Sequence, residues 1–216
     1  MLELAVKSLV AYLVGSLMGA LILGLVRGVD IRTQGSGNAG GTNALRTQGI
    51  WFAFGVILID VAKGWFAAGV LPGLALPGIP ADPANHRAWL TLSCAAAVTL
   101  GHVYPVWFEF RGGKGAATLI GVLLGFAPRL LPPMLAVWLV TVMLTGYVGL
   151  GTMLGAVTLP AWLALRGPYE PALLVYAVGM ALFVIYTHRL NIVRMWSGTE
   201  NRARRLWLLR GRSTAR

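Results

Sequence analysis

Charged residues are scarce in this sequence. They make up 12% of the 216 residues, whereas 57% are hydrophobic, and the mean hydropathy is +0.72. A water-soluble domain carries roughly 25% charged residues, so the composition excludes that class and indicates a membrane protein. Seven helical spans of ~20 residues would occupy ~140 positions. Because too little chain remains for a separate soluble domain, we expect one integral-membrane domain over residues 1–216.

Acidic residues, cysteine and histidine are also few: seven Asp and Glu, one Cys and three His. Cys94 has no second cysteine to pair with, which excludes an intramolecular disulfide, and we expect it to pack as a small hydrophobic residue. The acidic residues are scattered singly, so there is no aspartate cluster of the kind that binds a divalent metal. We therefore expect no metal site built from such a cluster.

Seven apolar windows predict an all-α membrane protein, a polytopic bundle of about seven transmembrane helices. The windows are residues 4–26, 50–71, 89–107, 116–130, 134–150, 151–165 and 171–186. The first is too long for the core of a signal peptide, so we expect a retained anchor. The fourth and sixth are short for a span, and a count of five remains an alternative.

Basic residues predict the orientation. Thirteen of the eighteen fall in the segments 27–49, 108–115 and 188–216, four fall on the other side, and Lys63 lies inside a window. The positive-inside bias places the thirteen in the cytoplasm, with the N-terminus outside and the C-terminus cytoplasmic. The net charge of +11 is then mostly a topology signal, and we expect no nucleic-acid partner. Residues 202–210 are expected to form an amphipathic helix on the anionic inner leaflet.

The first of these basic segments contains a glycine-rich motif, GSGNAGGTNALR, at residues 35–46. Such a run can turn backbone N–H groups inward around an anion, while hydroxyl, amide and guanidinium groups add donors. The candidate groups are Ser36, Gly37, Asn38, Gly40, Thr42, Asn43 and Arg46. Taken alone, the same composition is equally typical of an ordinary flexible loop.

The second motif, FRGGKGAAT at residues 110–118, opens the fourth window. Glycines around a lysine at a helix N-terminus favour an anion, because free N–H groups and the positive end of the helix dipole meet there. The candidates are Arg111, Gly112, Gly113, Lys114, Gly115 and Thr118. The motif is not a nucleotide-binding P-loop, since Gly115 follows the lysine where Ser or Thr is required. His102 lies just before this motif, and we expect it to be a hydrogen-bonded packing residue rather than a catalyst.

The third motif follows the last window and reads HRLNIVRMWSGTENR at residues 188–202. In a helix, His188, Asn191 and Arg194 share one face, and Gly198 and Glu200 follow. The alternative is an interfacial helix with solvated cations. Within the second window, Asp60 and Lys63 are three residues apart and are expected to pair, either in a functional role or as a structural ion pair.

Three loops rich in donors on one membrane face predict a site for a phosphate-bearing ligand at the lipid boundary. Together with DVAKG at residues 60–64, these motifs resemble those of the bacterial acyl-phosphate:glycerol-3-phosphate acyltransferase family, in the family's order and over the whole chain. Leu190 and Met195 depart from the family's motifs at positions that we regard as variable.

The resemblance implies an enzyme of the bacterial cytoplasmic membrane with its active site on the cytoplasmic face. It would transfer a fatty acyl group from acyl-phosphate to the 1-hydroxyl of glycerol 3-phosphate, giving lysophosphatidic acid and phosphate in the first committed step of phospholipid synthesis, without a metal or coenzyme. The implied partners are these two substrates and membrane lipids. The implied catalytic residues are Ser36, Arg46, Lys114, His188 and Asn191; the other motif residues, Arg194, Gly198 and Glu200 among them, would bind substrate, and Asp60, Lys63 and His102 would support the site.

Glycerolipid acyltransferases with an HxxxxD motif are excluded, because the fifth residue after each histidine is Thr91, Trp107 or Val193. A transporter or flippase for an anionic phosphate compound remains the alternative, although its binding groups would be expected in broken helices near the bilayer midplane. For the acyltransferase, the hydroxyl proton can pass to a donor phosphate oxygen or to His188, and both routes stay open.

Overall fold

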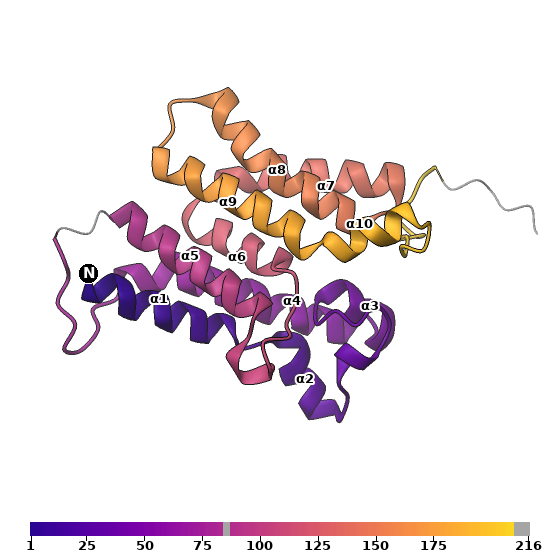
Figure 1. Ribbon diagram of the computed structural model, residues 1–216, viewed down its shortest axis with the longest axis horizontal. Helices are drawn as coiled ribbons and strands as arrows, with labels where there is room; N and C mark the ends of the chain where they lie inside the picture. The colour runs from indigo at the N-terminus through magenta and orange to yellow at the C-terminus, as the bar shows by residue number, and fades with distance from the viewer. Residues whose placement is uncertain (84–86, 210–216) are drawn as a thin grey trace, which may run out of the picture. The chain divides into compact units, whose positions relative to one another are not determined.

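The computed structural model describes residues 1–83 and 87–209 and is built from helices (Figure 1). The described residues contain no β-strand, only an isolated bridge between Leu76 and Ile79. The chain divides into two compact units, residues 1–128 and 129–216. The all-α prediction is therefore confirmed.

The first unit contains six α-helices, joined by loops that carry the first two motifs. They are α1 (Leu2–Gly15), α2 (Gly19–Arg27), α3 (Gly41–Gln48), α4 (Ile50–Trp65), α5 (Arg87–Val103) and α6 (Ala116–Phe126). A π-helical turn (Phe66–Val70) and a 3-10 turn (Leu71–Gly73) extend α4, and further 3-10 turns lie at Ile31–Thr33 and Val106–Phe108. Helix α1 packs along α5, and α4 packs along α6 (Figure 1).

Glycine makes both helix pairs possible. A Cβ atom at Gly121 of α6 would lie 1.9 Å from the carbonyl oxygen of Val61 in α4. A Cβ atom at Gly101 of α5 would lie 2.1 Å from the carbonyl oxygen of Tyr12 in α1. Such backbone contact is how membrane helices gain packing energy where the lipid provides no hydrophobic driving force.

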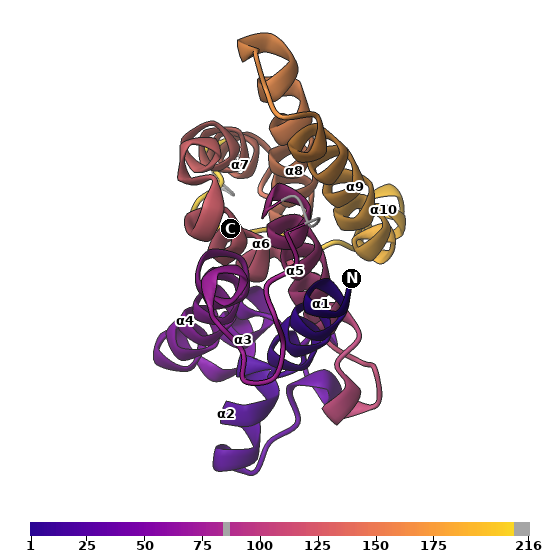
Figure 2. The same cartoon turned by 90° about the vertical axis from the view of Figure 1, so that its left-hand side faces the viewer.

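The second unit is a row of three long helices followed by a short one. They are α7 (Leu131–Thr145), α8 (Val148–Arg166), α9 (Pro171–Thr187) and α10 (Arg189–Trp196). Helix α8 packs against both α7 and α9 (Figure 2). The 3-10 turn Pro128–Leu130 leads into α7.

Four helical segments in the described chain are long and apolar enough to cross a membrane: Ile50–Gly73, Arg87–Phe108, Pro128–Thr145 and Val148–Arg166. Two bent pairs also qualify if each is one span, α1 with α2 (40°) and α9 with α10 (52°). Helix α6 is apolar but has only 11 residues. These elements follow the predicted windows in order, and the count of seven spans remains a prediction.

Several predictions from the sequence differ from the structure. The first window is broken at residues 16–18, between α1 and α2. The fifth ends at Thr145 instead of residue 150, because Gly146 adopts φ +77° and stops α7, so that the sixth begins at Val148. Within residues 202–209 the structure has turns where an amphipathic helix was expected, and Arg210 lies outside the described residues.

The tail departs from a helix because its donors are used by the end of α7. The N–H groups of Ala203 and Leu208 donate to the carbonyl oxygens of Gly146 (2.7 Å) and Met143 (2.9 Å). The indole N–H of Trp207 donates to the carbonyl of Leu144. These carbonyls have no partner within α7 itself, so tertiary hydrogen bonds win over local helix formation.

The contact at Gly121 predicts a large effect of the smallest possible substitution. Gly121→Ala should destabilise the protein in detergent by about 1–3 kcal/mol, because the added methyl group forces α4 and α6 apart. That corresponds to a fall in Tm of roughly 2–12 °C, measured by tryptophan fluorescence. Gly179→Ala is the matched control in α9, where a Cβ atom would meet nothing within 4 Å. An equal Tm for the two variants would contradict the proposed helix contact.

Candidate active site

A buried asparagine organises the first motif. Asn43, in the first turn of α3, is 1% exposed, and its Nδ2 donates to the carbonyl oxygens of Ile31 (3.2 Å) and Gln34 (2.9 Å). Its Oδ1 accepts the N–H of Ser36 at 3.0 Å. The amide that was expected to bind ligand is thus engaged with the backbone of the loop, and it positions Ser36.

The other polar groups of this motif are accessible. Ser36 and Asn38 are half-buried, whereas Thr42 and Arg46 of α3 are exposed. Gly35 and Gly37 have φ values of +57° and +71°, so the loop turns where other residues would be strained. The hydroxyl and amide groups of Ser36, Asn38 and Thr42 therefore lie on or beside a tightly turned backbone that leads into α3, and Arg46 follows in the last turn of that helix.

The second motif folds back onto the end of α5. The N–H groups of Gly112 and Gly113 donate to the carbonyl oxygens of Val103 and His102, each at 3.1 Å. A Cβ atom at Gly112 would lie 2.1 Å from the carbonyl oxygen of His102, so only glycine fits. The half-buried Lys114 follows, just before α6. We call residues 112–115 the glycine turn.

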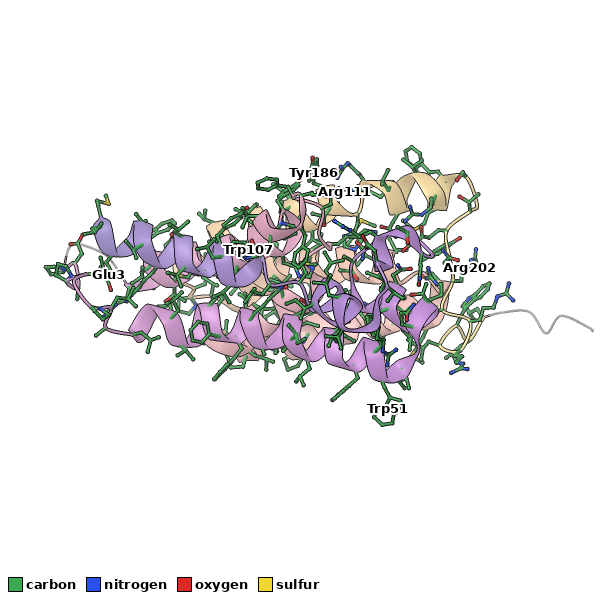
Figure 3. All side chains as sticks on the ribbon, turned by 90° about the horizontal axis from the view of Figure 1, so that it is seen from below. Glu3, Trp51, Trp107, Arg111, Tyr186 and Arg202 are labelled. Atoms are coloured by element: carbon green, nitrogen blue, oxygen red, sulfur yellow. The ribbon has the colours of Figure 1, made fainter. Side chains whose placement is uncertain are left out.

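The first two motifs meet within the first unit. A Cβ atom at Gly113 would lie 3.1 Å from the carbonyl oxygen of Ala39, so the two backbones are in contact. A second link comes from Arg32, whose Nη1 donates to the carbonyl of Phe108 at 3.1 Å. Figure 3 places Arg111 and Trp51 away from Glu3, which marks the other end of this unit.

Asp30 holds Arg32 in place, and neither residue was predicted from the sequence to belong to the site. The Asp30 carboxylate accepts from Arg32 Nε (3.1 Å) and Nη2 (2.8 Å). These hydrogen bonds from Arg32 hold the pKa of Asp30 below its ordinary value, which keeps the pair ionised at neutral pH. The available signal was an acid and a base two residues apart, directly before the glycine-rich motif.

Asp60 and Lys63 pair as expected. Both are buried in α4, with Lys63 Nζ 3.0 Å from Asp60 Oδ1. His102 Nδ1 lies 3.5 Å from the same oxygen.

Thr118, which was expected to bind substrate, is fully buried in α6, and its hydroxyl has no hydrogen-bond partner in the described part of the chain.

The third motif is organised by Glu200. Its two carboxylate oxygens accept from Asn191 Nδ2 (2.8 Å) and Arg194 Nε (2.7 Å). Gly198, at φ +70°, turns the chain after α10 so that the Glu200 N–H reaches the Arg194 carbonyl. Glu200 therefore orients the two side chains that were expected to face a ligand.

His188 lies at the junction of α9 and α10. It is 4% exposed, and its Nδ1 lies 2.8 Å from the carbonyl oxygen of Val184. A carbonyl can only accept, so we assign a proton to Nδ1, and in the neutral ring Nε2 is then a hydrogen-bond acceptor. This is the tautomer that a general base requires.

Gly149 was also missed by the sequence analysis. A Cβ atom at this position of α8 would lie 3.0 Å from Asn191 Nδ2, so glycine makes room for the asparagine. No local pattern in the sequence distinguishes this glycine from the others in the spans.

Within the described residues, no group of three or more His, Cys, Asp or Glu side chains is placed to hold a metal ion.

Comparison with known proteins adds independent findings. A family model described as glycerol-3-phosphate acyltransferase matches residues 5–198. Curated proteins of that name are similar, including one from Bacillus velezensis, 42% identical, with 91% of this chain and 96% of the relative covered. Another from Chlorobaculum tepidum is 38% identical, with 89% and 93% covered.

Solved structures agree. A crystal structure of PlsY (YgiH), an integral membrane glycerol 3-phosphate acyltransferase in its glycerol 3-phosphate form, is similar with a TM-score of 0.79 and 32% identity, over 92% of this chain and 94% of that one. Its lysophosphatidic acid form gives a TM-score of 0.76 over the same shares. The extent and level of these matches lead to one conclusion: this integral membrane protein belongs to the glycerol-3-phosphate acyltransferase family.

Proposed function

We propose that this protein transfers a fatty acyl group from acyl-phosphate to the 1-hydroxyl of glycerol 3-phosphate, giving lysophosphatidic acid and inorganic phosphate. The observation that carries the proposal is the glycine turn. It presents Lys114 at the start of α6 and touches the backbone of the first motif at Ala39. Lys114 and the N–H groups in the first turn of α6 thereby lie next to the first motif, an arrangement that suits the binding of a phosphate group.

Binding and positioning supply most of the proposed catalysis. Both substrates carry a phosphate of charge near −2, and each charge-assisted hydrogen bond contributes ~1.5–3 kcal/mol. The proposed donors are Ser36, Thr42, Arg46 and Lys114 from the first unit and Asn191 from the second. We propose that the groups of the third motif act in the same reaction as those of the first two.

The bond changes are simple for an activated donor. The 1-hydroxyl oxygen attacks the acyl carbon, and the bond from that carbon to the phosphate oxygen breaks. The leaving phosphate needs no protonation comparable to that of an amine, so positioning and stabilisation of the oxyanion suffice. The hydroxyl proton passes either to His188 Nε2 or to an oxygen of the donor phosphate. The protonation inferred for His188 from its contact with Val184 supports the first route.

The proposed location is the bacterial cytoplasmic membrane, with the active site on the cytoplasmic face and the N-terminus outside. The distribution of basic residues supports this orientation. An enzyme whose acyl donor has one charged and one apolar end needs a basic site beside the lipid. The protein has an exposed apolar surface on its helices, including Leu58, Leu139 and Leu182.

The orientation predicts that all three motifs are shielded from the outside. Single cysteines placed at Asn38, Lys114 and Thr199 should resist a membrane-impermeant maleimide in intact cells. Background labelling is low, because Cys94 is fully buried. A cysteine at Ala81, which is exposed in the connection between α4 and α5, is the positive control and should label. Labelling of any motif cysteine from outside would contradict a common cytoplasmic site.

The acyl donor provides the most direct test of the function. Purified protein given acyl-phosphate and glycerol 3-phosphate without metal should release phosphate and form lysophosphatidic acid, measured by phosphate assay and mass spectrometry. Acyl-coenzyme A should act at most as a poor inhibitor. Equal efficiency with acyl-coenzyme A would overturn the proposed donor.

Lys114 is expected to be essential for substrate binding. Lys114→Ala should lower kcat/KM by ~10- to 150-fold, because it removes a charge-assisted contact of ~1.5–3 kcal/mol. Lys114→Arg should keep the membrane orientation yet lose much of the activity, since the turn holds a compact ammonium group and not a planar fork.

The matched control for Lys114 is Arg166→Ala, which removes an exposed basic residue at the end of α8, outside the motifs. Its kcat/KM should stay within twofold of wild type. Near wild-type turnover by correctly inserted Lys114→Ala would show that the glycine turn is structural.

A further inference from the structure

The break between α1 and α2 exposes backbone groups that a membrane cannot hydrate. Helix α1 ends at Gly15, and α2 begins at Gly19. Carbonyl groups at the end of a helix and N–H groups at the start of the next lack partners within their helices. In a bilayer each such group costs several kcal/mol unless the protein satisfies it. This break lies just before the chain that carries the first motif.

The ion pair of α4 satisfies this break. Lys63 Nζ donates to the carbonyl oxygens of Gly15 (2.8 Å) and Leu17 (2.9 Å). Asp60 Oδ1 accepts the N–H of Gly19 at 3.3 Å. The cation thus lies at the C-terminal end of α1, where the helix dipole is negative, and the anion lies at the N-terminal end of α2, where it is positive. Both placements are favourable.

His102 lies between the Asp60 carboxylate and the glycine turn. His102 is 2% exposed, and its Nδ1 lies 3.5 Å from Asp60 Oδ1. On the other edge of the ring, a Cβ atom at Gly113 would lie 2.2 Å from Nε2. The imidazole therefore fills the space between Asp60 and the backbone of the glycine turn.

His102 contacts the glycine turn a second time through its own carbonyl oxygen, which accepts the Gly113 N–H at 3.1 Å. A shift of the ring or of the end of α5 must therefore move Gly113 and the adjoining Lys114. Asp60 therefore contacts two parts of the structure that adjoin the site. One is the break between α1 and α2, which precedes the first motif, and the other is His102, which packs against the glycine turn of the second motif.

We infer that Asp60, Lys63 and His102 form a buried positioning device for the phosphate-binding loops. Asp60 and Lys63 fix the start of α2, and Asp60 fixes the glycine turn by acting through His102. None of the three side chains touches substrate in this account. The inference rests on the proposed function, because it takes the glycine turn to be the phosphate site.

The test is a double-substitution cycle on purified enzyme. His102→Gln removes the ring, and Asp60→Asn removes the charge while keeping an oxygen that can accept the Gly19 N–H. Misplacement of a substrate-binding group by about 1 Å costs up to ~100-fold in rate, so each single variant should lower kcat/KM for glycerol 3-phosphate by about 10- to 100-fold. Because Asp60 acts through His102, the double variant should lose no more than the worse single variant. Losses that multiply in the double variant would overturn the inference.

A matched control separates positioning from loss of stability. Glu3 is a carboxylate, also buried (3% exposed), paired with Lys7 at 2.7 Å, at the other end of the same unit from Trp51 (Figure 3). Glu3→Gln should lower the Tm in detergent but leave KM for glycerol 3-phosphate within twofold of wild type. If Glu3→Gln raised this KM as much as Asp60→Asn, the effect of Asp60 would be general destabilisation.

His102→Gln decides the matter if Asp60→Asn fails to insert, since it leaves the Asp60–Lys63 pair intact. An unchanged KM and kcat in this variant would overturn the inference, whereas inactivity of the wild-type protein with acyl-phosphate would reject the proposed function itself.

Discussion

The structure depends on a single requirement, that every backbone group freed inside a membrane must find a partner within the protein. Continuous helices meet it by themselves, but this chain interrupts its first span at residues 16–18. Placing an acid and a base of α4 at that break costs least when the two charges pair and their remaining polar atoms are hydrogen-bonded. Here each one also neutralises the other, with 3.0 Å between Lys63 Nζ and Asp60 Oδ1. The other buried acidic residue, Glu3, also has such a partner in Lys7.

A carboxylate is used in a similar way beside the first motif and within the third. Asp30 holds Arg32 beside the first motif, and Glu200 holds Arg194 and Asn191 within the third. In both cases a carboxylate fixes side chains that would otherwise be flexible. A site that works by positioning needs rigid supports of this kind more than it needs reactive groups.

Much of the fold was predictable, because hydropathy reports directly on burial in lipid. The all-helical class and the order of the apolar elements follow from the windows, and the pairing of Asp60 with Lys63 follows from their spacing. The end of α7 was not predictable to the residue, since Gly146 stops the helix through a φ of +77° that hydropathy does not encode. The break at residues 16–18 likewise lies inside an uninterrupted apolar window, where its partners on α4 are invisible to local analysis.

The three segments of the candidate site were predictable from the sequence, but the role of each residue in them was not. Composition marks residues 35–46 and 112–115 as rich in donors, whereas the partner of each donor depends on the tertiary fold. Asn43 and Thr118 illustrate this: the amide of the first is engaged with backbone groups, and the second is fully buried. Gly149 is required by Asn191, which is distant in sequence, and no local rule finds it. The motif marks Gly113, but not the His102 ring against which it packs.

The docking of the tail onto α7 has a consequence for how relatives of this protein can diverge. Gly146 leaves space for Arg202, whose guanidinium stacks on Tyr147 and Trp207 at 4.5 and 4.2 Å from the ring centres. An insertion between α7 and α8 would separate these groups and free three carbonyl oxygens at once. The connection between α8 and α9, residues 167–170, is exposed along its whole length. We therefore expect length variation among homologues to collect in the α8–α9 connection and to be nearly absent from the α7–α8 corner.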